Sequence, residues 1–551
     1  MTARRNGGVV LSEGRRLVVA VAGGLMLAAA FPKLGLAGLA WLAPGTILWA
    51  ACGARSPFRT GYAAGLAFSL AAFHWLLFIP VRFYPILGWL ALGGYLALFP
   101  ACWCWLCLRA NGGGQKPAVQ TQNLEAGPDG TDAEVCWRRR LGWALFCAAA
   151  WVAVEMLQAR FLTGFPWNLL GVSQYKSLPL IQVASVTGVY GVSWVVAWVS
   201  VSLMLAARQL VRCPLRRYAW LSDLILPGLA VLMLYAAGLS HIASFPAPTR
   251  HLRAALVQPS IPQTMIWNSH ESETRFQQVL RLSELALATK PDLLVWPEAA
   301  TPKLLRYDRD IYEAVTNLVR SHRVWLLLGA DDAEPRGPKE ADYYNSSFLI
   351  DPQGKIAATY RKRRLVIFGE YIPLARWLPF IKWLTPIDSG FTPGDRVVPF
   401  AMPELGARMA TLICFEDIFP HWAREYAAPD TDFLVNLTND GWFGESAAQW
   451  QQAANAVFRA VENGLPLVRC ANNGLTCWID PLGLMHEVYF GDSNDIYGSG
   501  FKTAQIPLRS GNQPRPPTFY NRHGDWFGWG CVAVVVAGLT LGWRKRKGSV
   551  A

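Results

Sequence analysis

The chain has 551 residues, of which 52% are apolar types and only 16% are charged, against roughly 25% charged in an ordinary soluble protein. This composition excludes a disordered or fibrous chain, and the 51 Lys and Arg with 38 Asp and Glu residues exclude a chain that is embedded in a membrane throughout. The net charge of +13 is compatible with nucleic-acid binding, but the basic residues gather at the ends of apolar runs, so membrane topology accounts for them and we expect no nucleic-acid partner.

Eight apolar stretches have about the length that a helix needs to cross a bilayer, which is about 20 residues. They cover residues 17–31, 36–52, 61–80, 85–108, 141–157, 178–207, 218–243 and 526–543. The first stretch is short and follows Arg15 and Arg16, so a cleaved signal peptide is the alternative interpretation for it. The sequence therefore predicts an α-helical membrane bundle of eight spans.

The basic residues also predict how the spans are oriented, because Lys and Arg accumulate in short cytoplasmic loops. With the N-terminus inside, nineteen Lys and Arg residues lie on the cytoplasmic side, and the short outside loops hold four, which are Lys33, Arg82, Arg160 and Lys176. This asymmetry places both termini in the cytoplasm. It also places everything between the seventh and eighth spans outside the cytoplasmic membrane.

Three regions follow from this pattern. Residues 1–244 are predicted to form a transmembrane region of seven helices, with a flexible cytoplasmic loop near 111–134 that is rich in Gly, Gln, Pro and Asp. Residues 245–525 are predicted to form an extracytoplasmic domain, and residues 526–551 a last transmembrane helix with a basic cytoplasmic tail.

The cysteines predict neither a disulfide framework nor a metal site. Most of the eleven lie in the apolar regions, and Cys104 and Cys107 have redox-like or zinc-like spacing but no second pair, so we interpret them as part of a membrane helix. We expect no metal and no organic cofactor. A nucleotide-binding loop, a dinucleotide fingerprint and a zinc-protease motif do not occur in the sequence.

The region 245–525 alternates short apolar runs with helical patterns, which indicates a layered α/β domain. The runs typical of strands are 253–258, 292–296, 324–329, 347–350, 409–414 and 432–436, and the clearest helical patterns are 271–289 and 446–463. Parallel strands joined by helices gather polar side chains at strand ends, where catalytic groups are often found.

Three polar residues follow such strands and could supply nucleophilic chemistry. Glu298 follows the run Leu-Leu-Val-Trp-Pro, Lys362 follows Tyr360-Arg, and Cys414 ends the run Thr-Leu-Ile. A thiol nucleophile needs a base to take its proton and a cation to stabilise the oxyanion, and Glu and Lys supply these roles. Taken singly, Cys414 could be a buried small residue and Lys362 part of a solvated basic face.

The sequence motifs around these residues resemble those of a known family. Val-Trp-Pro-Glu298, Tyr-Arg-Lys362 followed by Phe-Gly-Glu370, and Ile-Cys414-Phe-Glu416 occur in the Glu, Lys, Cys order of the nitrilase (carbon–nitrogen hydrolase) superfamily. With seven spans before and one after, nearly the whole chain resembles the bacterial apolipoprotein N-acyltransferases. Supporting matches include Thr163-Gly-Phe-Pro-Trp-Asn168 and Asn436-Leu-Thr-Asn-Asp-Gly-Trp-Phe-Gly444.

The resemblance implies a fold, a reaction and further site residues. It implies a nitrilase-like four-layer αββα sandwich in the inner membrane of a bacterium, with the catalytic domain on the periplasmic side. It implies acyl transfer through a thioester on Cys414, from a phospholipid to the amino terminus of a diacylglyceryl-cysteine apolipoprotein, and we expect a monomer. By carry-over, the supporting residues are Glu370, Glu416 and Asn345, and the residues that contact lipid are Trp267, Phe415 and Trp442.

Three residues differ from those usual in the family, and these differences bear on the preference of the enzyme among its substrates. Phe415 stands where Tyr is frequent, Ile367 where Pro is frequent, and Gln452 where His is frequent. The rival interpretations are a membrane-tethered amidase that uses water as acceptor, a transporter with a ligand-binding external domain, and a catalytically inactive scaffold. The spans carry few charges, which disfavours the transporter.

Overall fold

The computed structural model describes residues 11–110, 131–212, 218, 220–266, 269–337, 340–373, 390–491, 493–509 and 515–548. The chain divides into two compact units, and each is described by itself. The helical unit comprises Met1–His74, Gly88–Ala243 and Asp525–Ala551, and the α/β unit comprises Trp75–Leu87 and Ser244–Gly524. The short segment Trp75–Leu87 therefore belongs with the α/β unit although its sequence neighbours belong to the helical unit.

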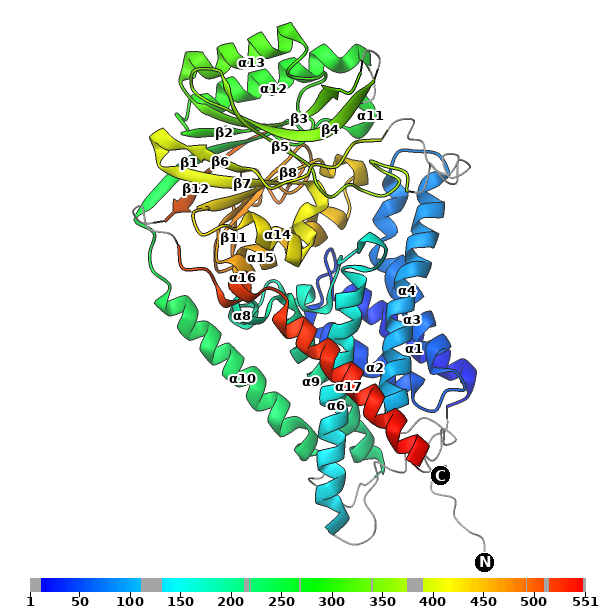
Figure 1. Ribbon diagram of the computed structural model, residues 1–551. Coiled ribbons are helices and arrows are strands. Elements are labelled where there is room, and N and C mark those ends of the chain that lie inside the picture. Colours follow the sequence, from blue (N-terminus) through cyan, green and yellow to red (C-terminus); the bar gives the residue numbers. More distant parts are fainter. Residues whose placement is uncertain are drawn as a thin grey trace, which may run out of the picture. The chain divides into compact units, whose positions relative to one another are not determined.

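Helices account for nearly all of the regular structure in the helical unit (Figure 1). They are α1 (Glu13–Ala29), α2 (Ala43–Ala51), α3 (Pro57–Ala72), α4 (Tyr84–Ala110), α6 (Thr131–Gln158), α7 (Leu178–Ile181), α8 (Ala184–Thr187), α9 (Val189–Arg212), α10 (Leu221–Ser244) and α17 (Trp526–Gly548). Small residues let them approach closely, because a Cβ on Gly24 of α1 would lie 2.1 Å from the carbonyl oxygen of Ala64 in α3.

The expectation of eight spans is only partly met by the described residues. Four helices are long and apolar enough to cross a membrane, and shorter apolar helices accompany them. The four are Tyr84–Arg109, Trp137–Gln158, Val189–Val211 and Leu221–Ser244, and the shorter ones are Ala37–Ala51, Leu178–Thr187 and Trp526–Leu541.

Two predicted spans have the wrong shape. The stretch 178–207 is not one helix, because the chain breaks at Gly188, which has φ 67° and separates α8 from α9. The stretch 61–80 is wrong at its end, since α3 stops at Ala72. Of the loop predicted near 111–134, residues 111–130 lie outside the described part of the chain, and α6 already begins at Thr131.

The α/β unit contains two six-stranded sheets, which confirms the predicted α/β class. The first sheet has the order β12-β1-β2-β3-β4-β5, with β1 (Arg250–Gln258), β2 (Leu293–Val295), β3 (Trp325–Pro335), β4 (Ala341–Ile350), β5 (Ile356–Arg361) and β12 (Gly500–Leu508). The second has the order β11-β10-β9-β8-β7-β6, with β6 (Pro399–Met402), β7 (Ala407–Ile413), β8 (Phe433–Thr438), β9 (Leu467–Ala471), β10 (Cys477–Ile479) and β11 (Met485–His486).

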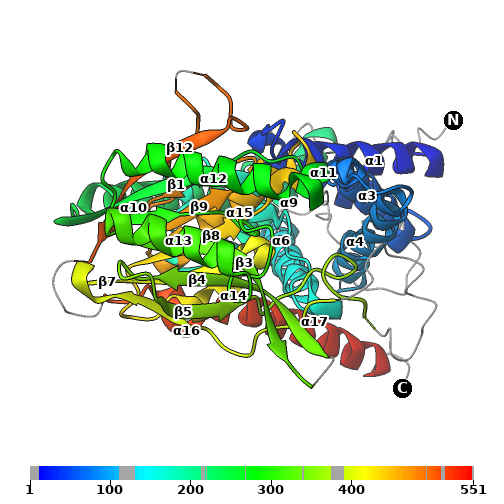
Figure 2. The same cartoon turned by 90° about the horizontal axis from the view of Figure 1, so that it is seen from above.

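Each sheet has a parallel centre, formed by β1-β2-β3 in the first and β7-β8-β9 in the second. The sheets pack face to face, since β1 contacts β9 and β4 contacts β7. Helices α12 (Ser272–Leu287) and α13 (Arg309–His322) cover the outer face of the first sheet, and α14 (Pro420–Tyr426) and α15 (Ala448–Asn463) that of the second (Figure 1). Figure 2 looks down on α12 and α13, which lie side by side over the strands.

The central strands are buried on both faces, which explains their continuous apolar sequences. All of β2 and β8 is buried, and Trp296, directly after β2, donates a hydrogen bond from Nε1 to Ser283 Oγ of α12 at 2.8 Å. This contact fixes the chain at the point where it leaves β2. The residues that follow the parallel strands are thereby held in place on a rigid support.

Candidate active site

Glu298 lies in a tight turn immediately after β2. The turn runs beside the next strand, where Ala300 N–H donates to Gly329 O at 2.8 Å. A Cβ on Gly329 would stand 2.7 Å from the Cα of Glu298, so only glycine permits this approach. The sequence patterns did not single out Gly329 beyond its place at the end of a strand run.

Lys362 follows β5 and is surrounded by the carboxylates of Glu298 and Glu370. Its Nζ lies 2.7 Å from Glu370 Oε1 and 3.5 Å from Glu298 Oε1, and the residue is only 1% exposed. Asn345 of β4 links the two acids, since its Nδ2 donates to Glu298 Oε1 at 2.8 Å and to Glu370 Oε1 at 3.1 Å. The structure thus brings together four of the residues that the sequence identified.

Cys414 follows β7 in the opposite sheet and has a left-handed backbone, with φ 53°. Such a conformation is uncommon for a residue other than glycine and is often found where a functional side chain is presented. Its carbonyl oxygen accepts hydrogen bonds from Asn436 Nδ2 at 2.7 Å and Gln452 Nε2 at 3.0 Å. These two amides, neither of which the sequence analysis assigned this role, hold the strained turn.

The thiol and the two charged groups influence one another's protonation. Burial is the largest effect on Glu298 and raises its pKa, whereas Lys362 and the hydrogen bond from Asn345 lower it. Burial and the charge of Glu298 raise the pKa of the Cys414 thiol, and Lys362 lowers it without outweighing them. The resting site therefore holds a protonated thiol beside Glu298.

Lys362 itself stays a cation. Burial alone would lower the pKa of Lys362, but the carboxylates of Glu370 and Glu298 outweigh burial and raise it above its ordinary value. A lysine of this kind does not serve as a base near neutral pH. It can donate hydrogen bonds to a developing negative charge in a water-poor site.

A third carboxylate, Asp331 of β3, lies near this group and was not singled out in the sequence. It stands directly opposite Asn345 in the pairing of β3 with β4. Burial, together with the charges of Glu298 and Glu370, raises the pKa of Asp331 to about 6. The site therefore carries more acidic groups than its single lysine balances.

Glu416 is fully buried and joins the lysine loop to the cysteine strand. Its Oε1 accepts from the backbone N–H groups of Arg363 and Arg364 at 2.8 and 2.9 Å, and its Oε2 accepts from Ile413 N–H at 2.8 Å. The hydroxyl of Tyr360 donates to the same carboxylate at 2.9 Å. One side chain thus connects the segment after Lys362 to the residue before Cys414.

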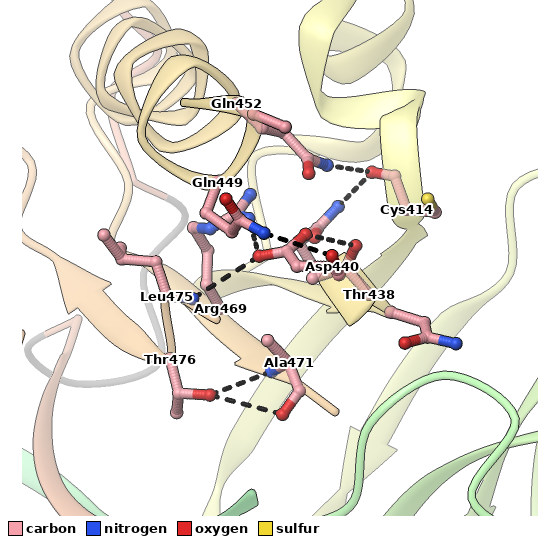
Figure 3. Close-up of polar contacts among 12 residues, drawn as sticks. Cys414, Thr438, Asp440, Gln449, Gln452, Arg469, Ala471, Leu475 and Thr476 are labelled. Atoms are coloured by element: carbon pink, nitrogen blue, oxygen red, sulfur yellow. Dashed lines mark hydrogen bonds and ion pairs between the residues drawn. The ribbon is translucent and has the colours of Figure 1, made fainter. Parts of the chain in front are cut away.

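Next to the cysteine turn lies a buried ionic cluster that the sequence analysis missed, and Figure 3 shows its members Arg469 and Asp440 together with Gln452. Arg469 of β9 donates to Asp417 Oδ2 at 2.6 Å and lies 3.6 Å from Asp440 Oδ2. Gln452 joins this cluster to the cysteine turn, because its Nε2 donates to Asp417 Oδ1 at 3.2 Å as well as to the carbonyl of Cys414. Removing one partner of such a buried pair would leave an uncompensated charge, which is strongly destabilising.

The segment Trp75–Leu87 contributes a side chain to the packing of the α/β unit. Trp75, in the 3-10 helix η2 (His74–Phe78), is 2% exposed and donates from Nε1 to Gln451 Oε1 of α15 at 3.1 Å. Its ring meets Phe443 edge-on, with centroids 4.7 Å apart. The sequence analysis had placed Trp75 in a membrane span.

The aromatic residues expected to contact lipid are only partly placed. Trp267 lies outside the described residues. Phe415 is half-buried, packs edge-on against Phe419 at 5.3 Å and lies under Lys362 Nζ, which is 5.8 Å from the ring centre. Trp442 is half-buried in the 3-10 helix η10 (Asp440–Phe443).

Of the three departures from the family pattern, Gln452 has the clearest local consequence. Its amide donates to the carbonyl of Cys414, so a donor is present at the position where histidine is frequent. Ile367 is half-buried in the loop between Lys362 and Glu370. Among the described residues, no group of three or more His, Cys, Asp or Glu side chains is arranged to hold a metal ion.

Two family models match the chain. The Carbon-nitrogen hydrolase model matches residues 253–489, and the Apolipoprotein N-acyltransferase N-terminal domain model matches residues 23–202. Among solved structures, an amidase from Nesterenkonia sp. is 17% identical and covers 48% of this chain and 94% of its own, with a TM-score of 0.35.

Curated relatives extend over nearly the whole length of the chain. The Apolipoprotein N-acyltransferase of Geobacter metallireducens is 34% identical over 97% of this chain and 96% of its own. The proteins of the same name from Bradyrhizobium diazoefficiens and Allorhizobium ampelinum are 35% and 30% identical, over 71% and 91% of this chain and 72% and 92% of their own. Since both halves of the chain and their order match, the chain belongs to the apolipoprotein N-acyltransferase family.

Proposed function

We propose that this membrane acyltransferase moves a fatty acyl chain from a phospholipid onto Cys414, and from there onto the α-amine of a diacylglyceryl-cysteine apolipoprotein. The observation that carries the proposal is the meeting of Glu298, Lys362 and Cys414 in a chain that also has membrane-length apolar helices. A soluble enzyme of the same chemistry has little access to either lipid. The family membership supports the N-acylation of apolipoproteins as the reaction.

In the first step, Glu298 takes the proton of the Cys414 thiol as the sulfur attacks the ester carbonyl. The carbon–sulfur bond forms, the ester carbon–oxygen bond breaks, and the proton passes from Glu298 to the glycerol oxygen of the departing lysophospholipid. Lys362 donates a hydrogen bond to the oxyanion, an interaction of a kind that contributes roughly 10²–10³ in rate. The raised pKa of Glu298 suits a group that both accepts and returns a proton.

In the second step, the amine of the acceptor attacks the thioester. The carbon–nitrogen bond forms and the carbon–sulfur bond breaks, while Glu298 accepts the amine proton and returns a proton to the sulfur. Glu370 and Asn345 position Lys362 and Glu298, and Glu416 positions the cysteine turn, in keeping with their contacts. Trp267, Phe415 and Trp442 contact lipid in this proposal.

We infer that the enzyme is a monomer in the bacterial inner membrane, with eight spans, both termini cytoplasmic and residues 245–525 in the periplasm. The asymmetry of Lys and Arg between the predicted loops supports the orientation. Residues 1–244 and 526–551 are the membrane regions in this proposal. No metal or organic cofactor takes part in either step.

A tethered amidase, with water as the final acceptor, is the second candidate because it needs the same Glu, Lys and Cys set. The deciding experiment is mass spectrometry of the purified full chain after incubation with phospholipid alone, beside Cys414→Ala. We expect a mass increase of one fatty-acyl group on Cys414. Hydroxylamine should release this group, and addition of a diacylglyceryl peptide should transfer it to the peptide amine. Absence of the adduct together with an unmodified peptide would exclude the thioester route, and release of free fatty acid without peptide acylation would support the amidase.

A further inference from the structure

A buried arginine that forms no ion pair lies close to the candidate active site. Arg275, in the first turns of α12, is 8% exposed. Its Nη2 donates to Ser272 Oγ at 3.3 Å, whereas its Nε has no hydrogen-bond partner. Among the residues that the structure describes, no carboxylate forms an ion pair with Arg275. Burial lowers the pKa of Arg275, and the charge of Glu271, four residues earlier, offsets this effect only in part. By contrast, the buried Lys362 and Arg469 are both paired with acids.

Arg275 faces the same pocket as the proposed base. The pocket is lined by apolar side chains that include Pro259, Ile261 and Pro302, and by three polar residues, which are Arg275, Glu298 and Asn472. The amide of Asn472 is already occupied, since it donates to Ile261 O at 2.8 Å and to Asn439 Oδ1 at 3.0 Å. Arg275 Nε and Glu298 Oε2 are therefore the polar atoms of these three side chains that lack a partner.

An unpaired guanidinium in a buried site favours an anion. Leaving a charge buried without a partner is costly, and a guanidinium fits the oxygens of phosphate or carboxylate through two parallel hydrogen bonds. The proposed acyl donor brings such an anion, because the glycerol that carries the ester also carries a phosphodiester. The reacting amine of the acceptor is not an anion and has no need of this cation.

We propose that Arg275 binds the phosphate of the phospholipid donor and so places its ester beside Glu298 and Cys414. The inference rests on the proposed function and adds the group that recognises the donor. Glu298 lines the same pocket as Arg275, so a phosphate held by Arg275 brings the acyl ester on the same glycerol toward the proposed base. Arg275 thereby distinguishes phospholipids from neutral lipids.

The experiment measures the rate at which Cys414 becomes acylated in the detergent-solubilised full chain. Two donors are compared, a long-chain phospholipid and the phosphate-free p-nitrophenyl ester of the same fatty acid. We expect Arg275→Gln to slow acylation by subsaturating phospholipid roughly tenfold to a hundredfold, as for the loss of a charged hydrogen bond, and to leave the rate with the nitrophenyl ester unchanged. Arg281→Gln, at an exposed position on the same helix, is the matched control and should change neither rate.

Several outcomes overturn the proposal. Equal slowing with both donors means that Arg275 only supports the fold around Glu298, and no slowing with phospholipid means that it does not contact the donor. Slower transfer from a preformed acyl-enzyme to a diacylglyceryl peptide, with normal acylation, assigns the residue to the acceptor. If Arg275→Gln does not fold, Arg275→Lys is tested instead. An acylation rate that lies between wild type and background for the phospholipid donor, but not for the nitrophenyl ester, supports phosphate binding.

The same measurement separates this proposal from the proposed function. Acylation of the wild type by the nitrophenyl ester but not by phospholipid overturns the phosphate site and leaves the nucleophile established. If neither donor acylates Cys414 in the wild type, the thioester mechanism fails, and the donor site fails with it.

Discussion

At the scale of single residues, the reactive group of the proposed mechanism is a thiol whose proton must be removed during the reaction. Burial and Glu298 keep the pKa of Cys414 above its ordinary value, and Lys362 offsets only part of this effect. A permanently ionised thiolate is therefore not the resting state. Protection of the thiol until an ester is bound limits its reaction with other electrophiles, because the thiolate is the nucleophilic form.

The pH dependence of acylation is expected to report Glu298. Glu298 must be ionised to accept the thiol proton, so the rate should fall as the pH is lowered through the pKa of Glu298. Burial raises this pKa, so the fall should begin at a higher pH than for an ordinary glutamate. Asn345 lowers this pKa through its hydrogen bond, so Asn345→Ala should move the acid limb of the profile upward. The measurement is Cys414 acylation by a nitrophenyl ester between pH 4 and pH 9, using about ten points. A limb that stays in place or moves downward contradicts the assignment of Glu298 as the base.

At the scale of elements, β2 leads into the turn with Glu298 and β7 into the turn with Cys414, but each turn is held by residues far away in the sequence. The sequence predicted β2, β7 and the order Glu, Lys, Cys, because apolar runs and flanking motifs are local features. It could not predict that Asn436 and Gln452 both donate to the carbonyl of Cys414, since their positions depend on how β8 and α15 pack. Long-range hydrogen bonds leave no pattern in one sequence.

The segment η2 shows a second limit of sequence patterns. An apolar run is buried equally well by lipid and by protein, so hydropathy assigned Trp75 to a membrane span, while the structure buries it against α15 and Phe443. The break at Gly188 is similar, because a glycine within an apolar stretch does not by itself reveal a left-handed turn. The class of each region was predictable, whereas the ends of the helices were not.

Trp75 is expected to stabilise the loop that carries Trp442. Trp75→Ala should lower the free energy of unfolding of the α/β unit by about 3–5 kcal/mol, the usual cost of truncating a buried large aromatic. Trp75→Phe keeps most of the ring and loses the hydrogen bond to Gln451, so about 1 kcal/mol is expected. Hydrogen exchange at residues 440–444 should become faster in both variants, in the same order. Exchange unchanged in Trp75→Ala would show that the contact does not hold this loop.

At the scale of the whole molecule, one chain combines apolar helices with a domain that performs acyl transfer. Both proposed substrates are lipids, so the spans serve access as well as anchoring. The charge asymmetry of the loops gives a topology that can be measured independently of activity.

The proposed topology predicts which side of the membrane each region faces. Glu313 is exposed on α13, so a cysteine at this position, in Glu313→Cys, should react with an impermeant maleimide in intact spheroplasts. Ser549→Cys, in the basic tail, should react only after permeabilisation. Labelling is scored as the excess over the unsubstituted chain, which carries the same native cysteines. The reverse pattern would place the α/β unit in the cytoplasm.

The participation of Trp75–Leu87 in the α/β unit has a consequence for how the chain is made. Synthesis proceeds from the N-terminus, so Trp75 leaves the ribosome long before Phe443 and Gln451 exist. Closing contacts between such distant residues is entropically costly and slow compared with local folding. The final packing of η2 must therefore wait until α15 has been synthesised, and a fragment that begins at Ser244 lacks the partner of Phe443 from the outset. The nascent enzyme is complete only when this early segment meets one of its last helices.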